Sequence, residues 1–472
     1  MRFLGALPQR TPKAHQERFA VLQFFFLIPF VISCFYVASG QRTKAFLNVY
    51  LPCLILIPTY WIVRLPHMPS ISPANGALIP IGFSVLFRPE TRWRFRRMDL
   101  WVVLFLTSVL LSETLREHNP KDGLIIWVQD FIEMFLAYIV GRQLIEPNQR
   151  LEVVKRIIFC FIALLPFALW EFRMGSNVFV EYGERIFHVQ SGWGLQLRGG
   201  HARVSVSFAH AILAGMLLTV AMSLNYYLAN IFRLDPRRLG PRMAWLQKNR
   251  IPLFAIPLML YMTGSRMPMA CGVLCFLLLQ IPRFPSMKTG AITILAIILI
   301  GGGTVYAAFQ KYTSLKEGQQ VDEAQSSAIY RRELLENYAP TLKEGGFLGW
   351  GVESFPRFPG QISVDNDYLI LQLSQGTFGK YSFILLGVEA VLTLVIAASQ
   401  FRSRETIYLV FSLMAGLIGI FVALGTVALF EQVIQVTFLL LGWSQSLVDI
   451  RAYGMETAPA VEPKFRFRRV FA

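Results

Sequence analysis

Three polar side chains, Asp365, Asn366 and Asp367, stand in the stretch SVDNDYLILQLSQG at the edge of a strongly apolar region. A carboxylate placed there can take a proton from a hydroxyl group, so Asp365 and Asn366 are candidate catalytic residues. Asp367 and Tyr368 are candidate contacts for an acceptor. The alternative is a structural role for Asp365 as the N-cap of a helix that ends at Gly376. A cap explains one acidic residue but neither Asn366 nor Asp367.

An arginine interrupts a second apolar stretch, IPLFAIPLMLYMTGSRMPMACGVLCFLLLQIP. Each half is too short to cross a hydrocarbon core alone, so the break at TGSRMP should lie below the outer surface and carry Arg266 into a low-dielectric position. Ser265 is the expected N-cap of the second half, and Pro268 suits its first turn. A guanidinium beside a helix N-terminus is suited to phosphate. Alternatively, Arg266 extends to the lipid headgroups.

Other basic groups flank the apolar stretches. Arg203 precedes one of them in HARVSVSFAHAILAG, where it is either a phosphate ligand or an interfacial anchor. Arg331 and Arg332 are adjacent, so at most one is expected to face inward. His201 and His210 titrate near neutrality and are candidate acid-base groups, although a histidine at a helix end is more often structural.

The chain that must position these groups is apolar. Of its 472 residues, 54% are hydrophobic and only 16% are charged, against roughly a quarter charged in soluble domains. Its mean hydropathy is +0.48. This composition predicts an all-α, polytopic membrane protein with about 12 or 13 transmembrane helices in a single membrane domain over residues 1–472. The candidate spans are residues 19–38, 45–63, 77–87, 100–111, 124–140, 157–170, 207–231, 251–263, 268–281, 291–309, 381–398, 407–424 and 425–441.

The net charge of +16 comes from short basic clusters between the apolar spans, as at residues 88–99, 233–250 and 464–469. Lys and Arg retained on the cytoplasmic side produce this pattern, which argues against nucleic acid as a partner. With these clusters inside, residues 171–206 form an external loop. Residues 310–380 form a large external loop with short helices that carries the candidate active site. Residues 1–87 fit either a cytoplasmic or an external N-terminus.

Neither a metal nor a cofactor is expected. The external segments contain no cluster of histidines, cysteines and carboxylates with ligand spacing, and all five cysteines lie in apolar segments.

Four segments occur in an order that resembles the O-antigen polymerase/ligase superfamily: RVSVSFAHAILAGMLL, TGSRMPMACGVLCFLLL, YRRELLENYAPTLKEGGFLGWGVESF and SVDNDYLILQLSQGTFG. The stretch FLAYIVGR is also similar to exopolysaccharide-polymerase-like members. The resemblance implies metal-independent, inverting transfer of a glycan from polyprenyl pyrophosphate to a sugar hydroxyl. It places this reaction at the periplasmic or outer face of a bacterial inner membrane.

The resemblance also implies roles for particular residues. Arg203, Arg266 and one of Arg331 or Arg332 match the arginines that stabilise the leaving pyrophosphate. Asp365 stands where many members carry a histidine, so this carboxylate is either the base or a group that orients the acceptor.

The expected partners are a polyprenyl-pyrophosphate-linked glycan, an acceptor glycan, the lipid bilayer and other polysaccharide assembly proteins. Two alternatives remain: ligation of the glycan to another acceptor, and a flippase for lipid-linked oligosaccharides. Transporters often show broken helices at the membrane midplane and inverted repeats. The single break near the outer face and the long loops on one side favour an enzyme.

Overall fold

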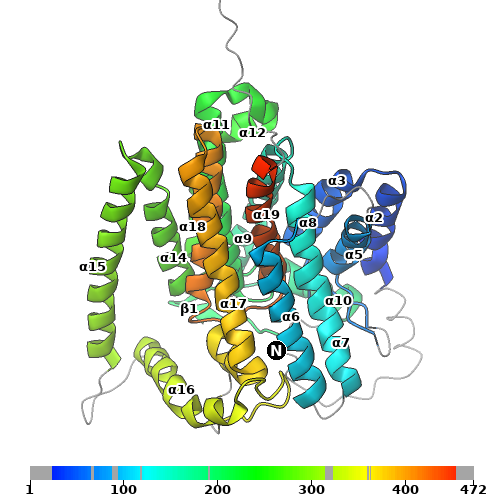
Figure 1. The fold of residues 1–472 in the computed structure, drawn as a ribbon, viewed down its shortest axis with the longest axis vertical. Helices are drawn as coiled ribbons and strands as arrows, with labels where there is room; N and C mark the ends of the chain where they lie inside the picture. Colours follow the sequence, from blue (N-terminus) through cyan, green and yellow to red (C-terminus); the bar gives the residue numbers. More distant parts are fainter. Residues whose placement is uncertain are drawn as a thin grey trace, which may run out of the picture.

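The computed structural model describes residues 24–64, 68–87, 94–116, 120–189, 192–313, 323–358, 361 and 363–452. These residues form a helical bundle with one two-stranded hairpin (Figure 1). The longest helices are α6 (Arg97–Arg116), α9 (Arg150–Met174), α11 (Ala211–Leu234), α15 (Met287–Thr313), α16 (Glu323–Gly345), α17 (Asp367–Gln400), α18 (Arg404–Ala423) and α19 (Gln432–Ala452).

Shorter elements complete the bundle. They are η1 (Phe24–Leu27), α2 (Ile28–Ala38), α3 (Arg42–Ala45), η2 (Phe46–Tyr50), α4 (Leu51–Leu56), α5 (Pro73–Leu86), α7 (Pro120–Asp130), η3 (Phe131–Leu136), α8 (Ala137–Leu144), α10 (Val178–Phe187), η4 (Pro236–Leu239), α12 (Gly240–Lys248), α13 (Ile251–Met262), α14 (Arg266–Leu278) and η5 (Ile281–Arg283). Strands β1 (Leu197–Arg198) and β2 (His201–Ala202) pair antiparallel.

Seven helical segments in the described part of the chain are long and apolar enough to cross a membrane. Six are single helices, α6, α9, α11, α15, α17 and α18, and the seventh is the continuous run Pro120–Leu144. The prediction of an all-α chain is therefore confirmed, and its long apolar helices are compatible with a membrane-embedded protein. The number of 12 or 13 crossings stays a prediction.

Close backbone contact holds α8 and α19 together. A Cβ atom added at Gly141 would lie 2.2 Å from the carbonyl oxygen of Leu439, and one added at Gly442 would lie 2.0 Å from that of Tyr138. Small residues permit this approach between membrane helices. The stretch FLAYIVGR also supplies Arg142, which forms a buried ion pair with Asp99.

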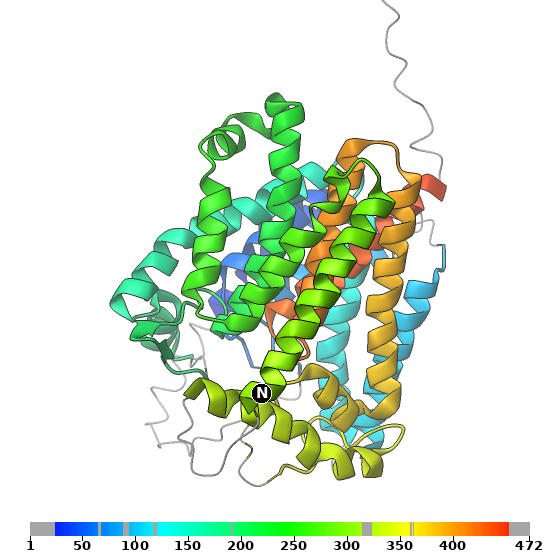
Figure 2. The ribbon, with the colours of Figure 1, turned by 90° about the vertical axis from the view of Figure 1, so that its left-hand side faces the viewer.

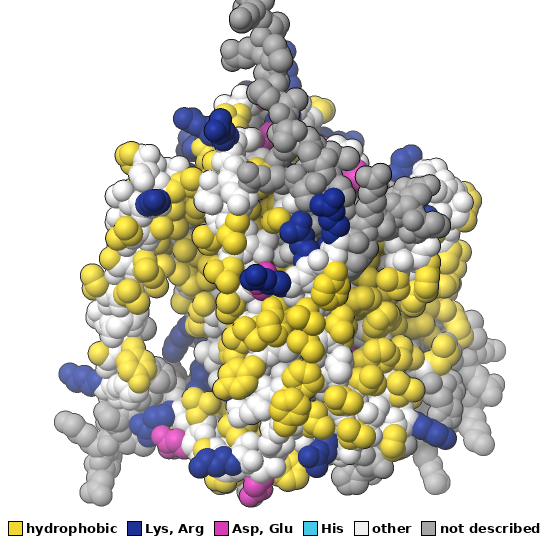
Figure 3. Space-filling model, viewed as in Figure 1, with side chains coloured by type: hydrophobic (Ala, Val, Ile, Leu, Met, Phe, Trp, Pro, Cys, Tyr) yellow, Lys and Arg dark blue, Asp and Glu magenta, His cyan; other side chains and the backbone are white. Residues whose placement is uncertain are grey.

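The described elements α10, α16 and β1, which belong to the predicted external segments, lie in one half of the molecule (Figure 1). Figure 2 shows α16 lying across one end of the bundle, while α12, in the basic stretch 233–250, occupies the other end. Hydrophobic side chains cover the face between the two ends (Figure 3). Helix α15 stands apart from the bundle, and very little of it is buried.

Of two expectations about helix boundaries, one is wrong and the other is confirmed. The span expected at residues 425–441 begins instead at Gln432, because residues 424–431 form a loop that contacts the start of α17. The expectation that a helix ends at Gly376 is confirmed, because α17 consists of two helices that meet there. Gly376 separates them with the non-helical values φ 67° and ψ −163°, which produce a kink.

Candidate functional site

The break between α13 and α14 occurs where the sequence predicts it. Thr263, Gly264 and Ser265 form a tight turn, with Gly264 at φ 59°. Ser265 stands at the N-cap position and Pro268 lies in the first turn, as expected. The hydroxyl of Ser265 does not cap the helix, however. It donates to the carbonyl of Thr263 at 3.2 Å, because the residue is buried against the turn.

Two arginines hold this turn from outside. The guanidinium of Arg203 donates to the carbonyl of Thr263 at 3.2 Å and to the hydroxyl of Ser265 at 2.9 Å. Its third bond goes to Oε1 of Gln196 at 2.7 Å. Arg198 donates to the carbonyl of Gly264 at 2.5 Å. The hydrogen-bond acceptors of Arg203 in the described chain are thus all neutral.

The electrostatic surroundings of Arg203 are positive. Burial, followed by the neighbouring charges of Arg198 and Arg331, lowers its pKa to about 10. The guanidinium still stays charged at neutral pH, so three cationic groups share one end of the bundle. Such a cluster favours an anion.

The adjacent arginines of α16 are both half-buried but differ in their interactions, and the expectation that at most one faces inward stays a prediction. The charge of Arg331 is one of those that lower the pKa of Arg203. Arg332 forms an ion pair with Glu336 one turn along α16, with 3.8 Å between Nε and Oε1.

The predicted low-dielectric position of Arg266 stays a prediction, because exposure on an apolar helix face is compatible with contact with lipid. Its side chain is exposed at the first position of α14, on the face that also carries the exposed Ala270 and Val273. Thr263 and Ser265 occupy the buried side of the turn, which leaves the outer side to Arg266.

The polar cluster at residues 365–367 divides into three roles. Asn366, not Asp365, is the N-cap of α17, because its Oδ1 accepts the N–H of Leu369 at 3.1 Å. The buried Asp367 accepts the N–H of Leu429 at 2.8 Å. The expectation that Asp365 caps the helix is therefore wrong.

Tyr368 continues the attachment of α17 to its neighbours. Its hydroxyl donates to the carbonyl of Phe421 near the end of α18 at 2.7 Å. Tyr368 thus fixes the start of α17 to the end of α18, and Asp367 fixes it to the loop between α18 and α19. Their contacts here are structural, and a role in binding an acceptor stays a prediction.

Asp365 is left outside the cap and half-buried. Its Oδ1 accepts the hydroxyl of Ser363 at 2.9 Å. The carbonyl of Ser363 in turn accepts the hydroxyl of Tyr330 at 2.5 Å. Because Tyr330 immediately precedes Arg331, this chain of contacts ties Asp365 to the helix that carries one of the clustered arginines.

A second chain of contacts leads from Arg203 to Phe430, in the loop between α18 and α19. Gln196 Nε2 lies 2.9 Å from His210 Nε2, and the ring of Trp193 meets His210 edge-on with centroids 4.7 Å apart. Trp193 also stacks with Phe430, at 6.5 Å. Phe430 follows Leu429, the residue that Asp367 holds.

The two histidines differ in their surroundings. His210 caps α11, since its Nδ1 accepts the N–H of Ile212 at 3.1 Å. Burial, followed by the charge of Arg203, lowers the pKa of His210 to about 4, so it is neutral at physiological pH. His201 is exposed and stacks on Phe172. Neither histidine has a contact that assigns it an acid-base role.

The Gly-rich stretch EGGFLGWG holds the kink of α17. Trp350 N–H donates to the carbonyl of Leu373, and Gly351 N–H to that of Ser374, each at 2.8 Å. A Cβ atom at Gly376 would lie 2.2 Å from the carbonyl oxygen of Phe347. The glycines therefore allow the backbone of this stretch to lie directly against the backbone of α17 at its kink.

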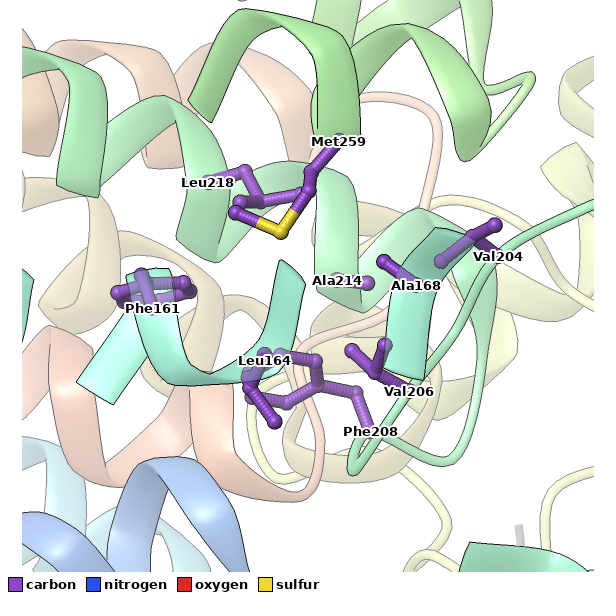
Figure 4. Close-up of a pocket in the computed structure, with 9 residues that line it drawn as sticks. All are labelled: Phe161, Leu164, Ala168, Val204, Val206, Phe208, Ala214, Leu218 and Met259. Atoms are coloured by element: carbon purple, nitrogen blue, oxygen red, sulfur yellow. The ribbon is translucent and has the colours of Figure 1, made fainter. Parts of the chain in front are cut away.

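A small apolar cavity lies behind the segment that carries Arg203. It has a volume of about 10 Å³ and is lined by Phe161, Leu164, Ala168, Val204, Val206, Phe208, Ala214, Leu218 and Met259 (Figure 4). A void of this size without polar groups barely holds one water molecule. It reflects packing and has no room for a substrate.

Sequence reasoning missed Arg198, Gln196, Trp193 and Tyr330. A signal for Arg198 was present, since the Gly199–Gly200 pair is typical of a hairpin turn. The hairpin pairs Arg198 with His201 and brings it beside Arg203. The other three residues carry no local signal, because their contacts join distant segments.

The fold and the site define a helical, membrane-type protein with an arginine cluster at one end of its bundle. No protein-family model and no curated protein matches the sequence.

Proposed function

We propose that the protein is a membrane glycosyltransferase that moves a glycan from polyprenyl pyrophosphate to a hydroxyl group of an acceptor sugar. The observation that carries this proposal is the cluster of Arg198, Arg203 and Arg331 beside the turn at residues 263–265. Guanidinium groups match phosphate well, because each planar fork can bind two oxygens. The ordered sequence motifs that resemble the O-antigen polymerase/ligase superfamily support the same function.

Asp365 is the general base in the proposed reaction. It accepts the proton of the acceptor hydroxyl while the hydroxyl oxygen forms a bond to the anomeric carbon. The bond from that carbon to the pyrophosphate oxygen breaks on the opposite side, so the configuration inverts. The electron pair leaves on the pyrophosphate, whose charge the arginines stabilise. The step balances without a metal or cofactor.

The proposed location is the outer face of a bacterial inner membrane. The arginine cluster lies in the half of the bundle opposite α12 and the basic stretch 233–250. Basic stretches of this kind remain on the cytoplasmic side. Polymerisation of repeat units is the proposed outcome, and ligation to another acceptor is the same chemistry with a different second substrate.

Binding of the donor lipid tests the arginine site. Purified protein in lipid nanodiscs is titrated with polyprenyl pyrophosphate and with the uncharged polyprenol of equal length. We expect binding to require the pyrophosphate, and Arg203→Lys to weaken it about tenfold or more, because an ammonium cannot bind two oxygens at once. Arg185→Lys, in an exposed side chain of the same external segment, is the matched control. Equal affinity for the two lipids would contradict the proposal.

The product of the reaction tests the enzyme class. Wild-type protein in liposomes is supplied with a polyprenyl-pyrophosphate-linked repeat unit. We expect elongated glycan still attached to polyprenyl pyrophosphate. Movement of the lipid-linked glycan across the bilayer without a new glycosidic bond would instead indicate a flippase.

A further inference from the structure

Glu171, in the last turn of α9, is a buried carboxylate that receives several hydrogen bonds. Its Oε1 accepts the N–H and the hydroxyl of Ser205, both at 3.0 Å, and the Nδ2 group of Asn177 at 3.0 Å. Its Oε2 accepts the N–H of Val206 at 2.8 Å. Four donors from three residues therefore converge on one side chain.

The segment that Glu171 holds has a strained backbone. Val206 has φ 47°, a left-handed conformation that is unfavourable for a β-branched residue. Such a residue persists only where its surroundings hold it in place. Asn177 contributes to this, because its Nδ2 group also donates to the carbonyl of Val206 at 2.9 Å. The turn at residues 205–206 is thus fixed by side chains of α9 and of the cap of α10.

The same segment carries Arg203. Between Arg203 and the turn, Val204 N–H donates to the carbonyl of Met262 at the end of α13, at 3.1 Å. Beyond the turn, Ser207 donates to the carbonyl of Ile55 at 2.6 Å. The backbone that carries Arg203 is therefore anchored both before and after the turn at residues 205–206, at Val204 and at Ser207.

We propose that Glu171 is the positioning residue of the arginine site. Its carboxylate holds the backbone of residues 205–206 and so sets the place from which Arg203 reaches Thr263 and Ser265. The expected effect on the affinity for the donor lipid rests on the proposed function, whereas the effect on the position of Arg203 does not. Glu171 itself has no role in contacting the substrate.

The variant Glu171→Gln tests this proposal. It keeps the size of the side chain but replaces one acceptor oxygen by a donor amide, which faces the N–H groups of Ser205 or Val206. Glu184→Gln removes the same charge from an exposed position of the neighbouring helix α10 and is the matched control. Ser205→Ala, which removes one of the four donors, is a milder variant in case Glu171→Gln fails to fold.

Two measurements are made on each variant: amide hydrogen exchange of residues 203–206 and of the turn at 263–265, and the affinity for polyprenyl pyrophosphate. For Glu171→Gln we expect exchange in this segment to be about tenfold faster or more, and affinity to fall about tenfold, at the same membrane abundance as the control. For Ser205→Ala we expect smaller changes in the same direction.

The two measurements separate the possible failures. Unchanged exchange in both Glu171→Gln and Ser205→Ala would overturn the positioning role. Faster exchange with wild-type affinity in the folded protein would also overturn it, since the residue would then be structural only. If the wild type binds no polyprenyl pyrophosphate, the proposed function fails. Faster exchange spreading from residues 203–206 to the turn at 263–265 in Glu171→Gln would then still support the placement of Arg203, and its absence would refute it.

Discussion

Replacing Asp365 by Asn separates chemistry from structure at the polar cluster. The Asp365 carboxylate accepts one hydrogen bond, from Ser363, and an Asn side chain can accept the same bond. The free energy of unfolding should therefore change by less than about 0.5 kcal/mol. If the carboxylate is the general base, turnover should fall about 10²–10⁴-fold, because that is the usual contribution of such a group. Donor binding should be unchanged.

Asn366→Ala gives the contrasting result. It removes the acceptor for the N–H of Leu369, so we expect a loss of about 1 kcal/mol in stability. Turnover per folded molecule should stay close to that of the wild type. The assay is glycan formed by purified variants at matched amounts of folded protein, with stability measured by denaturant unfolding. An Asp365→Asn variant that forms glycan at the wild-type rate would refute the assignment of this residue as the base.

Three other predictions concern the kink, the buried histidine and metal dependence. Gly376→Ala combines a positive φ with overpacking against Phe347 and should lower the free energy of unfolding by about 2–6 kcal/mol; Gly302→Ala, which has open space around it, should lower it by nothing measurable in the same denaturation assay. Because the folded pKa of His210 is depressed from 6.5 to about 4, its contribution to stability should be complete above pH 6.5 and be lost as the pH falls toward 4. His210→Asn, which keeps an acceptor for the cap, should flatten that part of the stability profile, and an unchanged profile would contradict the assignment. Activity should survive EDTA, since no group of three or more His, Cys, Asp or Glu side chains in the described residues could hold a metal; a loss that divalent cations restore would contradict this.

Hydropathy located the helices because an apolar run must be buried or face lipid wherever it lies in the fold. The break before Arg266 could also be predicted from the local sequence, because the two apolar halves on either side of it are short and Pro268 favours a helix start. The start of α19 could not be read in this way. It depends on Asp367 holding the N–H of Leu429, a contact between segments far apart in the chain.

In the candidate site too, some features follow from the local sequence and others depend on contacts between distant segments. Asp and Asn are comparable N-caps, so the sequence alone could not choose between Asp365 and Asn366. The exposure of Arg266 depends on which side of the turn Thr263 and Ser265 occupy. Glu171 gave no signal, because its donors come from the next helix and from residues 205–206, and only the folded chain brings them together.

Helix α15 has 27 residues and is therefore about 40 Å long, against roughly 30 Å for the hydrocarbon core of a bilayer. Because so little of it is buried, we expect the tilt of α15 in a bilayer to respond to lipid thickness. Its end is joined to α16, where Gln325 donates to the carbonyl of Tyr312 at 2.9 Å, and α16 carries Arg331. Hydrophobic mismatch at α15 would then reach α16, so we expect the acyl-chain length of the surrounding lipids to affect the site to which Arg331 belongs.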